Sequence, residues 1–178
     1  MASPSTPNLA FLSIGANIDP EKNLPAAVRE LSRHGRVAAV SHVWQSPAAG
    51  KGGQPDFLNA AILLETSLSA TQLKDMAITP IETLLGRVRS SDKFDPRPID
   101  IDIMLFNHDI FRIGSRSIPD PEVLERPFVA IPLAEIAPHY RHPETGETLA
   151  VIAARFELRA SGMIRRDDVI LCPHPEWN

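Results

Sequence analysis

The stretch Ile99–Phe106, IDIDIMLF, sets the interpretation of the whole sequence. Isoleucine and aspartate alternate at its start, which is typical of a β-strand with one buried face and one polar face. Because side chains two residues apart share a face of a strand, we expect Asp100 and Asp102 on one face and the isoleucines on the other. The stretch therefore predicts a strand that contributes to an apolar core and carries a pair of carboxylates.

Apolar runs and helical periodicities precede this strand. Further strands are predicted at Leu9–Ile14, Val37–Val43 and Phe57–Thr66, and helices from near Asn23 to Gly35 and over Ser69–Leu85. Pro25 fits the first helix only in its first turn, which is why the start is placed near Asn23. Pro80 predicts a kink or a fresh start in the second helix, with Thr79 as its cap and Glu82 closing a capping box.

The second half of the chain is rich in proline and glutamate, and only short elements are expected there. Short helices are predicted near Glu122–Glu125, Ile131–Ile136 and Thr148–Arg155, and Asp168–Leu171 is either an edge strand or part of a loosely attached tail. The order strand, helix, strand, strand, helix, strand indicates an α+β fold. We expect a single-domain, ferredoxin-like α/β/α sandwich with a mostly antiparallel central sheet.

Length and charge limit the classes of function. The 178 residues suit one domain, with a flexible tail at 1–7, the main domain at 8–156 and a C-terminal extension of unassigned role at 157–178. Lys and Arg number 18 against 22 Asp and Glu, and the net charge of −4 argues against a binder of duplex nucleic acid.

Cysteine usage and hydropathy bear on the compartment. The single cysteine, Cys172, excludes an internal disulfide and suits a reducing compartment. No apolar run approaches the ~20 residues of a membrane helix, and the first residues show no signal-peptide pattern. A cytoplasmic protein without membrane association is the expectation.

The aspartate pair is a candidate metal site. Two carboxylates on one face repel each other unless a cation lies between them, and Mg²⁺ binds one or two carboxylates together with phosphate oxygens. The alternative is a solvated strand face with two incidental aspartates. Four cations lie just upstream: Arg87, Arg89, Lys93 and Arg97. They favour a magnesium polyphosphate site, although a solvated loop paired with Asp92 and Asp95 would have the same composition.

Other chemistries find little support. Gly50-Lys51-Gly52-Gly53 has the wrong spacing for a phosphate loop and is interpreted as a lid or turn. Scattered histidines and one cysteine do not make a zinc site, and no nucleophile elbow is present for serine catalysis. The loops Ala48–Gln54 and Arg89–Pro96 are expected to be mobile without ligand and to close over it, because of their glycine and charge content.

Four segments resemble the 6-hydroxymethyl-7,8-dihydropterin pyrophosphokinase family of folate synthesis. SIGANI at 13–18 resembles the opening strand and its Gly-Ser-Asn turn, with Ala16 in the serine place. QSPAAGKGGQPDFLNAAILLET at 45–66 resembles the pterin-binding stretch, and IETLLGRVRSSDKFDPRPIDIDIMLF at 81–106 the family signature. IPDPEVLERPFVAIPLAEIAP at 118–138 resembles the closing signature. The resemblance covers roughly Leu9 to Phe156.

This resemblance implies a reaction. Pyrophosphate would pass from ATP to the hydroxymethyl group of a reduced pterin, giving the pterin diphosphate and AMP, with two Mg²⁺ ions bridging the ATP phosphates and both aspartates. A monomer is expected, with ATP and the pterin as its partners and no nucleic acid or membrane. The alternatives are a catalytically weak paralogue that binds pterin or nucleotide, a pyrophosphokinase for a different pterin, and a DxD glycosyl or nucleotidyl transferase. The last would need a longer nucleotide-binding α/β domain.

The resemblance also implies roles for single residues. The implied catalytic residues are Arg87, Arg97, Asp100 and Asp102, of which the two aspartates are the metal ligands. The implied ATP contacts are Arg87, Arg89, Phe94, Arg97 and Arg126. The implied pterin contacts are Ser46, Pro47, Phe57, Asn59 and Phe128, with the two phenylalanines sandwiching the ring and the asparagine binding its amide edge.

One departure from the family pattern concerns the nucleotide. Asp120 follows Pro119 where the family usually has a histidine that contacts the nucleotide. If Asp120 faced the triphosphate, its charge would weaken ATP binding. We favour the alternative that Pro119 and Pro121 turn it outward, where it caps the short helix at Glu122–Glu125.

Overall fold

A six-stranded antiparallel sheet forms the centre of the computed structural model, which describes residues 6–48, 53–88 and 95–171. Its strands are β1 (Asn8–Ala16), β2 (Arg36–Val40), β3 (Trp44–Ser46), β4 (Phe57–Thr66), β5 (Asp100–Phe106) and β8 (Ile164–Arg165). The order is β5-β1-β4-β3-β8, and β2 also pairs with β4. The predicted ferredoxin-like, mostly antiparallel sheet is confirmed.

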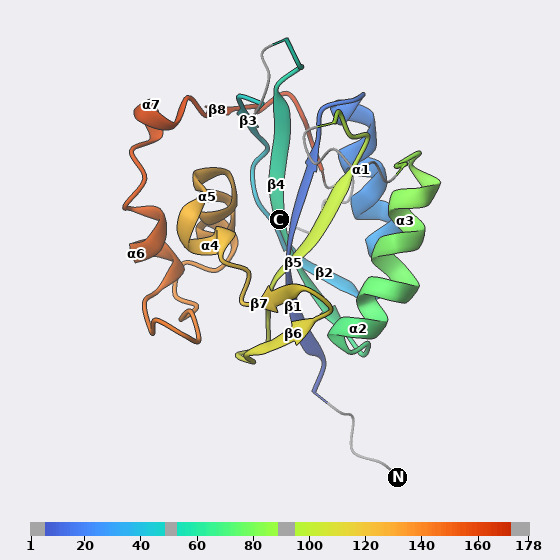
Figure 1. The fold of residues 1–178 in the computed structure, drawn as a ribbon, viewed down its shortest axis with the longest axis vertical. Coiled ribbons are helices and arrows are strands. Elements are labelled where there is room, and N and C mark those ends of the chain that lie inside the picture. Colours follow the sequence, from blue (N-terminus) through green and yellow to red (C-terminus); the bar gives the residue numbers. More distant parts are fainter. Residues whose placement is uncertain (1–5, 49–52, 89–94, 172–178) are drawn as a thin grey trace.

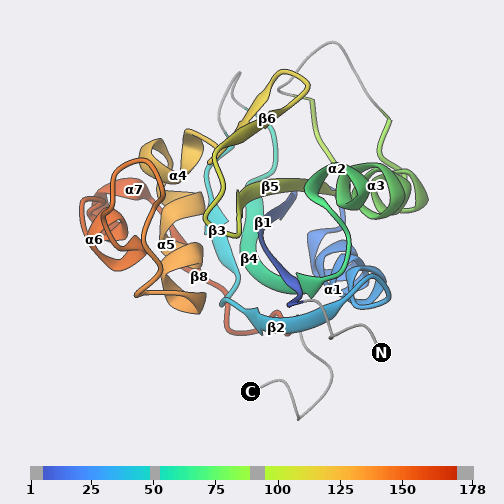
Figure 2. The ribbon, with the colours of Figure 1, turned by 90° about the horizontal axis from the view of Figure 1, so that it is seen from below.

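Two groups of helices cover the two faces of the sheet (Figures 1 and 2). One group is α1 (Pro20–Leu31), α2 (Ala70–Leu73), the π-helical turn η1 (Lys74–Ile78) and α3 (Thr79–Leu84). The other is α4 (Glu122–Glu125), α5 (Pro127–Ile136) and α6 (Leu149–Ala153), followed by α7 (Leu158–Ser161). Each face has its own buried apolar cluster, so the sandwich has two cores.

The side chains of β5 point alternately to the two faces of the sheet, as predicted. Ile99, Ile101 and Ile103 are buried in the cluster on the α1 and α3 side. Met104 belongs to the cluster on the α5 side. Asp100 and Asp102 are only partly buried and face the cavities described below.

The register of β1 places three functional candidates in one row. Gly15 pairs with Asn59 of β4 on one side and with Asp100 of β5 on the other. Directly opposed residues of an antiparallel sheet share a face, so the amide and the carboxylate lie on the same face. A Cβ at Gly15 would lie 2.9 Å from Asn59 Oδ1, so the glycine makes room for the asparagine.

The chain runs without a break from α2 through η1 into α3, and Pro80 lies in the first turn of α3, where a kink or a fresh start was predicted. The π-helical turn η1 joins α2 to α3, and a widened turn accommodates a proline that lacks the N–H its own turn requires. Thr79 makes no side-chain cap, and Glu82 closes no capping box. Glu82 is instead buried at the inner side of the helix, 6% exposed.

Other boundaries also differ from the sequence predictions. The first helix begins at Pro20, so Pro25 lies in its second turn, where a buried face of Leu24, Ala27, Val28 and Leu31 offsets the missing N–H. The predicted strand Val37–Val43 is shorter in the structure: β2 ends at Val40, residues 41–43 are irregular, and β3 begins only at Trp44. Within β2, the pairing with β4 shifts register between Val37 and Ala39.

Four short elements were not predicted, namely β6 (Phe111–Ile113), β7 (Arg116–Ile118), β8 and the helix α7. A hairpin of β6 and β7 lies beside β5. The edge strand of the C-terminal segment is β8, not Asp168–Leu171, which lies beyond it as irregular chain. Within the described ranges, none of the helices has the length and apolar character needed to cross a membrane.

The row across the sheet gives a first prediction. Gly15→Ala should lower the free energy of unfolding by about 1–2 kcal/mol, because the new methyl group displaces a buried amide. In an Asn59→Ala background the same substitution should cost little, since the displaced atom is gone. Urea denaturation of the four proteins of this cycle measures the coupling, and purely additive costs would contradict the proposed contact.

Candidate active site

Two cavities, each of about 330 Å³, meet at the aspartates of β5. Four residues line both of them: Arg97, Asp100, Asp102 and Arg116. All four are charged, and the β5 carboxylates and the two guanidinium groups occupy the junction. A group bound in one cavity can therefore meet a group bound in the other at this junction.

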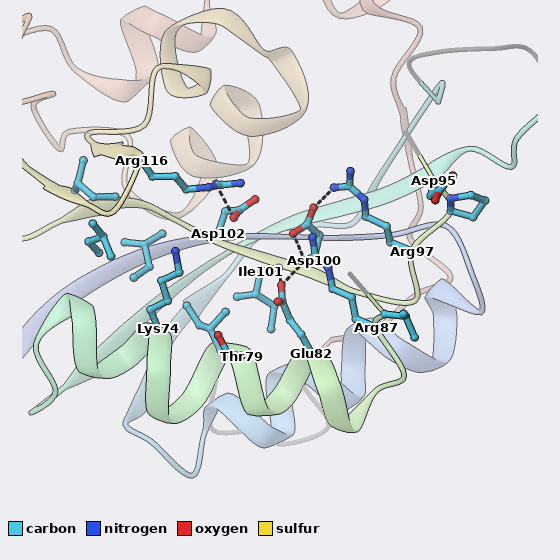
Figure 3. Close-up of a pocket in the computed structure, with 16 residues that line it drawn as sticks. Lys74, Thr79, Glu82, Arg87, Asp95, Arg97, Asp100, Ile101, Asp102 and Arg116 are labelled. Atoms are coloured by element: carbon cyan, nitrogen blue, oxygen red, sulfur yellow. Dashed lines mark hydrogen bonds and ion pairs between the residues drawn. The ribbon is translucent and has the colours of Figure 1, made fainter. Parts of the chain in front are cut away.

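The first cavity lies between the helix η1–α3 and β5 (Figure 3). Its apolar lining consists of Ile78, Val88, Ile101, Ile103, Ile113 and Ile118. Lys74, Thr79 and Glu82 project from the helix toward β5, and Arg116 reaches in from β7. The cavity thus combines apolar side chains with a concentration of charge.

Asp100 is held between two arginines. Its carboxylate pairs with Arg87 through one oxygen and with Arg97 through the other. Arg87 also pairs with Glu82, whose Oε1 accepts the Ile101 backbone N–H at 2.9 Å. Burial raises the pKa of Glu82, against the lowering effects of that N–H and of Arg87.

Asp102 is paired with one cation and surrounded by acids. Arg116 Nη1 lies 2.6 Å from Asp102 Oδ1. Burial, followed by the negative charge of Asp100, raises the pKa of Asp102 to about 7, although Arg116 lowers it. Arg116 alone does not outweigh the burial and the neighbouring negative charge, so a further cation would stabilise the ionised carboxylate of Asp102.

The aspartates suit a metal whose remaining ligands come from substrate. Among the described residues, no group of three or more His, Cys, Asp or Glu could hold a metal by protein ligands alone. Mg²⁺ is commonly bound by one or two carboxylates together with substrate phosphates and waters. Asp100 and Asp102, side by side at the junction, fit that donor set.

The second cavity combines aromatic rings with a buried amide. Its lining includes Phe57 and Asn59 from β4, Phe128 from α5, and Ser46 and Pro47 at the end of β3. Asn59 is 5% exposed, and its Nδ2 donates to Ser46 Oγ at 2.8 Å. Aromatic faces and a fixed amide suit a flat heteroaromatic ring with a polar edge.

Most of the predicted site residues line these cavities. All five predicted pterin residues line the second, and Asp100, Asp102 and Arg97 line both. Arg87 lines the first cavity, whereas Arg126, predicted as an ATP contact, lines the second. Arg89 and Phe94 lie outside the described residues, as do 49–52 and 89–94 of the two predicted closing loops.

Asp120 does not face outward. It is 7% exposed, its Oδ1 accepts the Glu122 backbone N–H at 3.0 Å, and its Oδ2 lies 3.6 Å from Arg116. The N-cap of α4 is Pro121, with no side-chain cap, so Asp120 is not the predicted cap, although it accepts the N–H of the first residue of the helix. The predicted outward orientation is also wrong, because the carboxylate lies beside Arg116. Asp120 lines neither cavity.

Several site residues were missed by the sequence analysis. Lys74, Thr79, Glu82 and Arg116 line the first cavity, and Ser13, Gly15 and Glu122 the second. Glu82 was assigned to a cap, although it stands five residues before Arg87 in the signature stretch, which was a usable signal. Arg116 had no such signal, because its hairpin was not predicted.

Comparison with known proteins agrees with this geometry. A family model described as 7,8-dihydro-6-hydroxymethylpterin-pyrophosphokinase (HPPK) matches residues 11–138. The chain is 38% identical over 132 residues to the 2-amino-4-hydroxy-6-hydroxymethyldihydropteridine pyrophosphokinase of Bacillus subtilis, covering 72% of this chain and 78% of that protein. The Pseudomonas aeruginosa protein of the same name is 33% identical over 147 residues, covering 81% and 90%.

A solved structure supports the fold. The crystal structure of wild-type Plasmodium falciparum HPPK-DHPS with pterin and p-hydroxybenzoate matches with a TM-score of 0.68 at 14% sequence identity. The match covers 93% of this chain and 46% of that one.

The raised pKa of Asp102 gives a second prediction. A carboxyl whose pKa is raised by folding binds more protons in the folded state, so the free energy of unfolding should fall as pH rises from about 4 toward 7. In metal-free buffer, Asp102→Asn should flatten this dependence and stabilise the protein at pH 8 by on the order of 1 kcal/mol. Chemical denaturation at pH 6 and pH 8 measures both. Asp167→Asn, at an exposed carboxylate, is the control, and an unchanged slope in Asp102→Asn would refute the assignment.

Proposed function

We propose how this chain, which belongs to the 7,8-dihydro-6-hydroxymethylpterin-pyrophosphokinase family, performs the reaction of that family. It is an ATP-dependent pyrophosphokinase of folate biosynthesis that acts on 6-hydroxymethyldihydropterin. The observation that carries the proposed mechanism is that the two cavities share the β5 aspartates and Arg97 and Arg116. We assign ATP to the first cavity and the pterin to the second.

The reaction is a displacement at phosphorus. The pterin hydroxymethyl oxygen forms a bond to the β-phosphorus of ATP and loses its proton, while the bond from that phosphorus to the α–β bridging oxygen breaks and AMP leaves. Positioning and charge neutralisation supply most of the catalysis in such transfers. Two cavities that meet at a charged junction hold the reactants for such an attack.

Asp100 and Asp102 would hold Mg²⁺, and the resemblance to the family implies two ions. Bound there, the metal would neutralise phosphate charge and lower the pKa of the attacking hydroxyl. Arg87, Arg97 and Arg116 now pair with carboxylates at the same place. Guanidinium groups bind phosphoryl oxygens as readily as carboxylates, so we assign these three to the ATP phosphates.

The remaining linings support the two assignments. The apolar side chains that line the first cavity suit the adenine base, and Lys74 and Thr79 line the same cavity. In the second cavity, Asn59 and Ser46 offer hydrogen bonds to the amide edge of the pterin, and Phe57 and Phe128 offer ring faces. Because one chain lines both cavities, we also propose that the enzyme acts as a monomer, and we place it in the cytoplasm on its cysteine usage.

An aspartate that faced the triphosphate would weaken ATP binding, and Asp120 would then favour the alternative of a catalytically weak paralogue. In the structure Asp120 lines neither cavity, and its carboxylate lies beside Arg116. The charge expected to repel the triphosphate is therefore directed at a cation. This placement supports the enzyme over the paralogue.

The first test of the proposal removes a metal ligand. Asp100→Ala and Asp102→Ala should each lower kcat about a hundredfold or more without unfolding the protein, because charge stabilisation in the transition state is lost. The assay is AMP release from Mg·ATP with and without 6-hydroxymethyl-7,8-dihydropterin. Asp109→Ala, exposed in the turn after β5, should retain full activity. Near-normal turnover in either β5 variant would exclude the metal assignment.

The second test separates the two substrates. Asn59→Ala should weaken pterin binding by about 1–3 kcal/mol, since a buried hydrogen-bonding partner is removed, and leave nucleotide binding almost unchanged. Calorimetric titration with each ligand gives both constants. Equal losses for pterin and nucleotide would indicate a general folding defect and contradict the assignment of the second cavity.

A further inference from the structure

The C-terminal segment 162–171 packs on the edge of the sheet beside the second cavity. It lies beyond the residues that the family model matches, which end at 138. Within it, β8 pairs with β3, with Arg165 opposite Trp44 and Ile164 opposite Gln45. Arg166 continues the contact, its backbone N–H donating to Val43 O at 2.8 Å. Buried apolar side chains fasten both ends of the segment: Met163 and Leu171.

β3, the strand with which this segment pairs, ends at the wall of the second cavity. β3 finishes at Ser46, and Ser46 and Pro47 both line the cavity. Gly162, in the left-handed conformation with φ 68°, lies so close that a Cβ there would be 3.3 Å from Pro47 Cγ. The segment therefore lies against Pro47, one of the two residues that form this wall of the cavity.

The side chain of Arg166 connects three parts of the molecule. Its Nη1 donates to Gln45 Oε1 at 3.0 Å, and its Nη2 lies 3.3 Å from Glu21 Oε1 of α1. Asp168 orients the guanidinium from within the segment, with bonds of 2.8 Å and 2.7 Å. One cation thus joins β3, α1 and the C-terminal segment.

Gln45 extends this connection across the loop between β3 and β4. Its Nε2 donates to Asp56 Oδ2 at 2.8 Å, so the same amide accepts from Arg166 and donates to Asp56. Asp56 directly precedes Phe57, whose ring lines the cavity. The side-chain amide of Gln45 therefore links the end of β3 to the residue before β4, and Arg166 fixes the position of that amide.

We propose that Arg166 is a positioning residue for the pterin site, acting through Gln45 on Ser46 and Pro47 at one end and on Phe57 at the other. The proposal rests on the assignment of the second cavity to the pterin. Arg166 is not among the residues that line that cavity. Its effect is to hold a three-residue edge strand and the start of β4 in the arrangement that the ligand requires, which lowers the ordering cost of binding.

The test compares two adjacent arginines. Arg166→Ala and Gln45→Ala should each raise the Kd for 6-hydroxymethylpterin about three- to tenfold, as expected for one or two lost hydrogen bonds. The double variant should be little worse than either single one, because both break the same connection. Nucleotide Kd should not change. Arg165→Ala removes an exposed arginine that pairs with Asp167 and should leave both constants unchanged.

A second readout keeps this proposal separate from the proposed function. Hydrogen exchange of the backbone amides at 43–46 and 56–58 should become faster in Arg166→Ala and stay at wild-type rates in Arg165→Ala, with or without ligand. If the wild type fails to bind the pterin, the assigned function is wrong, and the exchange data still decide whether Arg166 orders this wall. Equal effects of the two arginine variants, or a pterin Kd unchanged in Arg166→Ala, would overturn the positioning role.

Discussion

The repulsion between two carboxylates set two residues apart on one strand is the constraint that organises this protein. Asp100 and Asp102 share a face of β5 and are partly removed from water. Such a pair is unfavourable without nearby positive charge, because both groups lose hydration and each raises the energy of the other. Three arginines satisfy it, and they come from separate parts of the chain: Arg87 after α3, Arg97 before β5 and Arg116 from β7. The loop, the helix end and the hairpin all converge on the strand for this reason.

The sheet then fixes where the two substrates can lie. β1 lies between β4 and β5, and its Gly15 stands between the asparagine of β4 and the first aspartate of β5. Neighbouring strands lie about 4.8 Å apart, so the register holds the amide and the carboxylate about two strand spacings from each other. No loop has to close for this separation to exist. The loops and helices add specificity around an arrangement that the backbone hydrogen bonds already determine.

The longer strands of the sheet could be predicted from the sequence, because each shows an apolar pattern over many residues. The ten residues of β4 were located correctly because a continuous apolar run of that length between turn signals has few alternatives. The aspartate pair was identified because two carboxylates on one face of a strand need a cation between them, whereas Asn59 was named from the family resemblance. The hairpin of β6 and β7 and the two-residue strand β8 were missed, since elements of two or three residues show no period. Asp120 was misplaced because its orientation depends on Arg116, which belongs to that unpredicted hairpin.

The pairing of β8 with β3 has a consequence for how this protein behaves in a crowded solution. A sheet that ended at β3 would present a row of unpaired N–H and C=O groups, which is a template for the edge of a second molecule. The two residues of β8 and the backbone N–H of Arg166 occupy part of that row, and Arg165 adds an exposed charged side chain to the new edge. The same few residues that hold the wall of a cavity therefore also protect the sheet from intermolecular strand addition, and their loss would expose the folded enzyme to aggregation through its own edge.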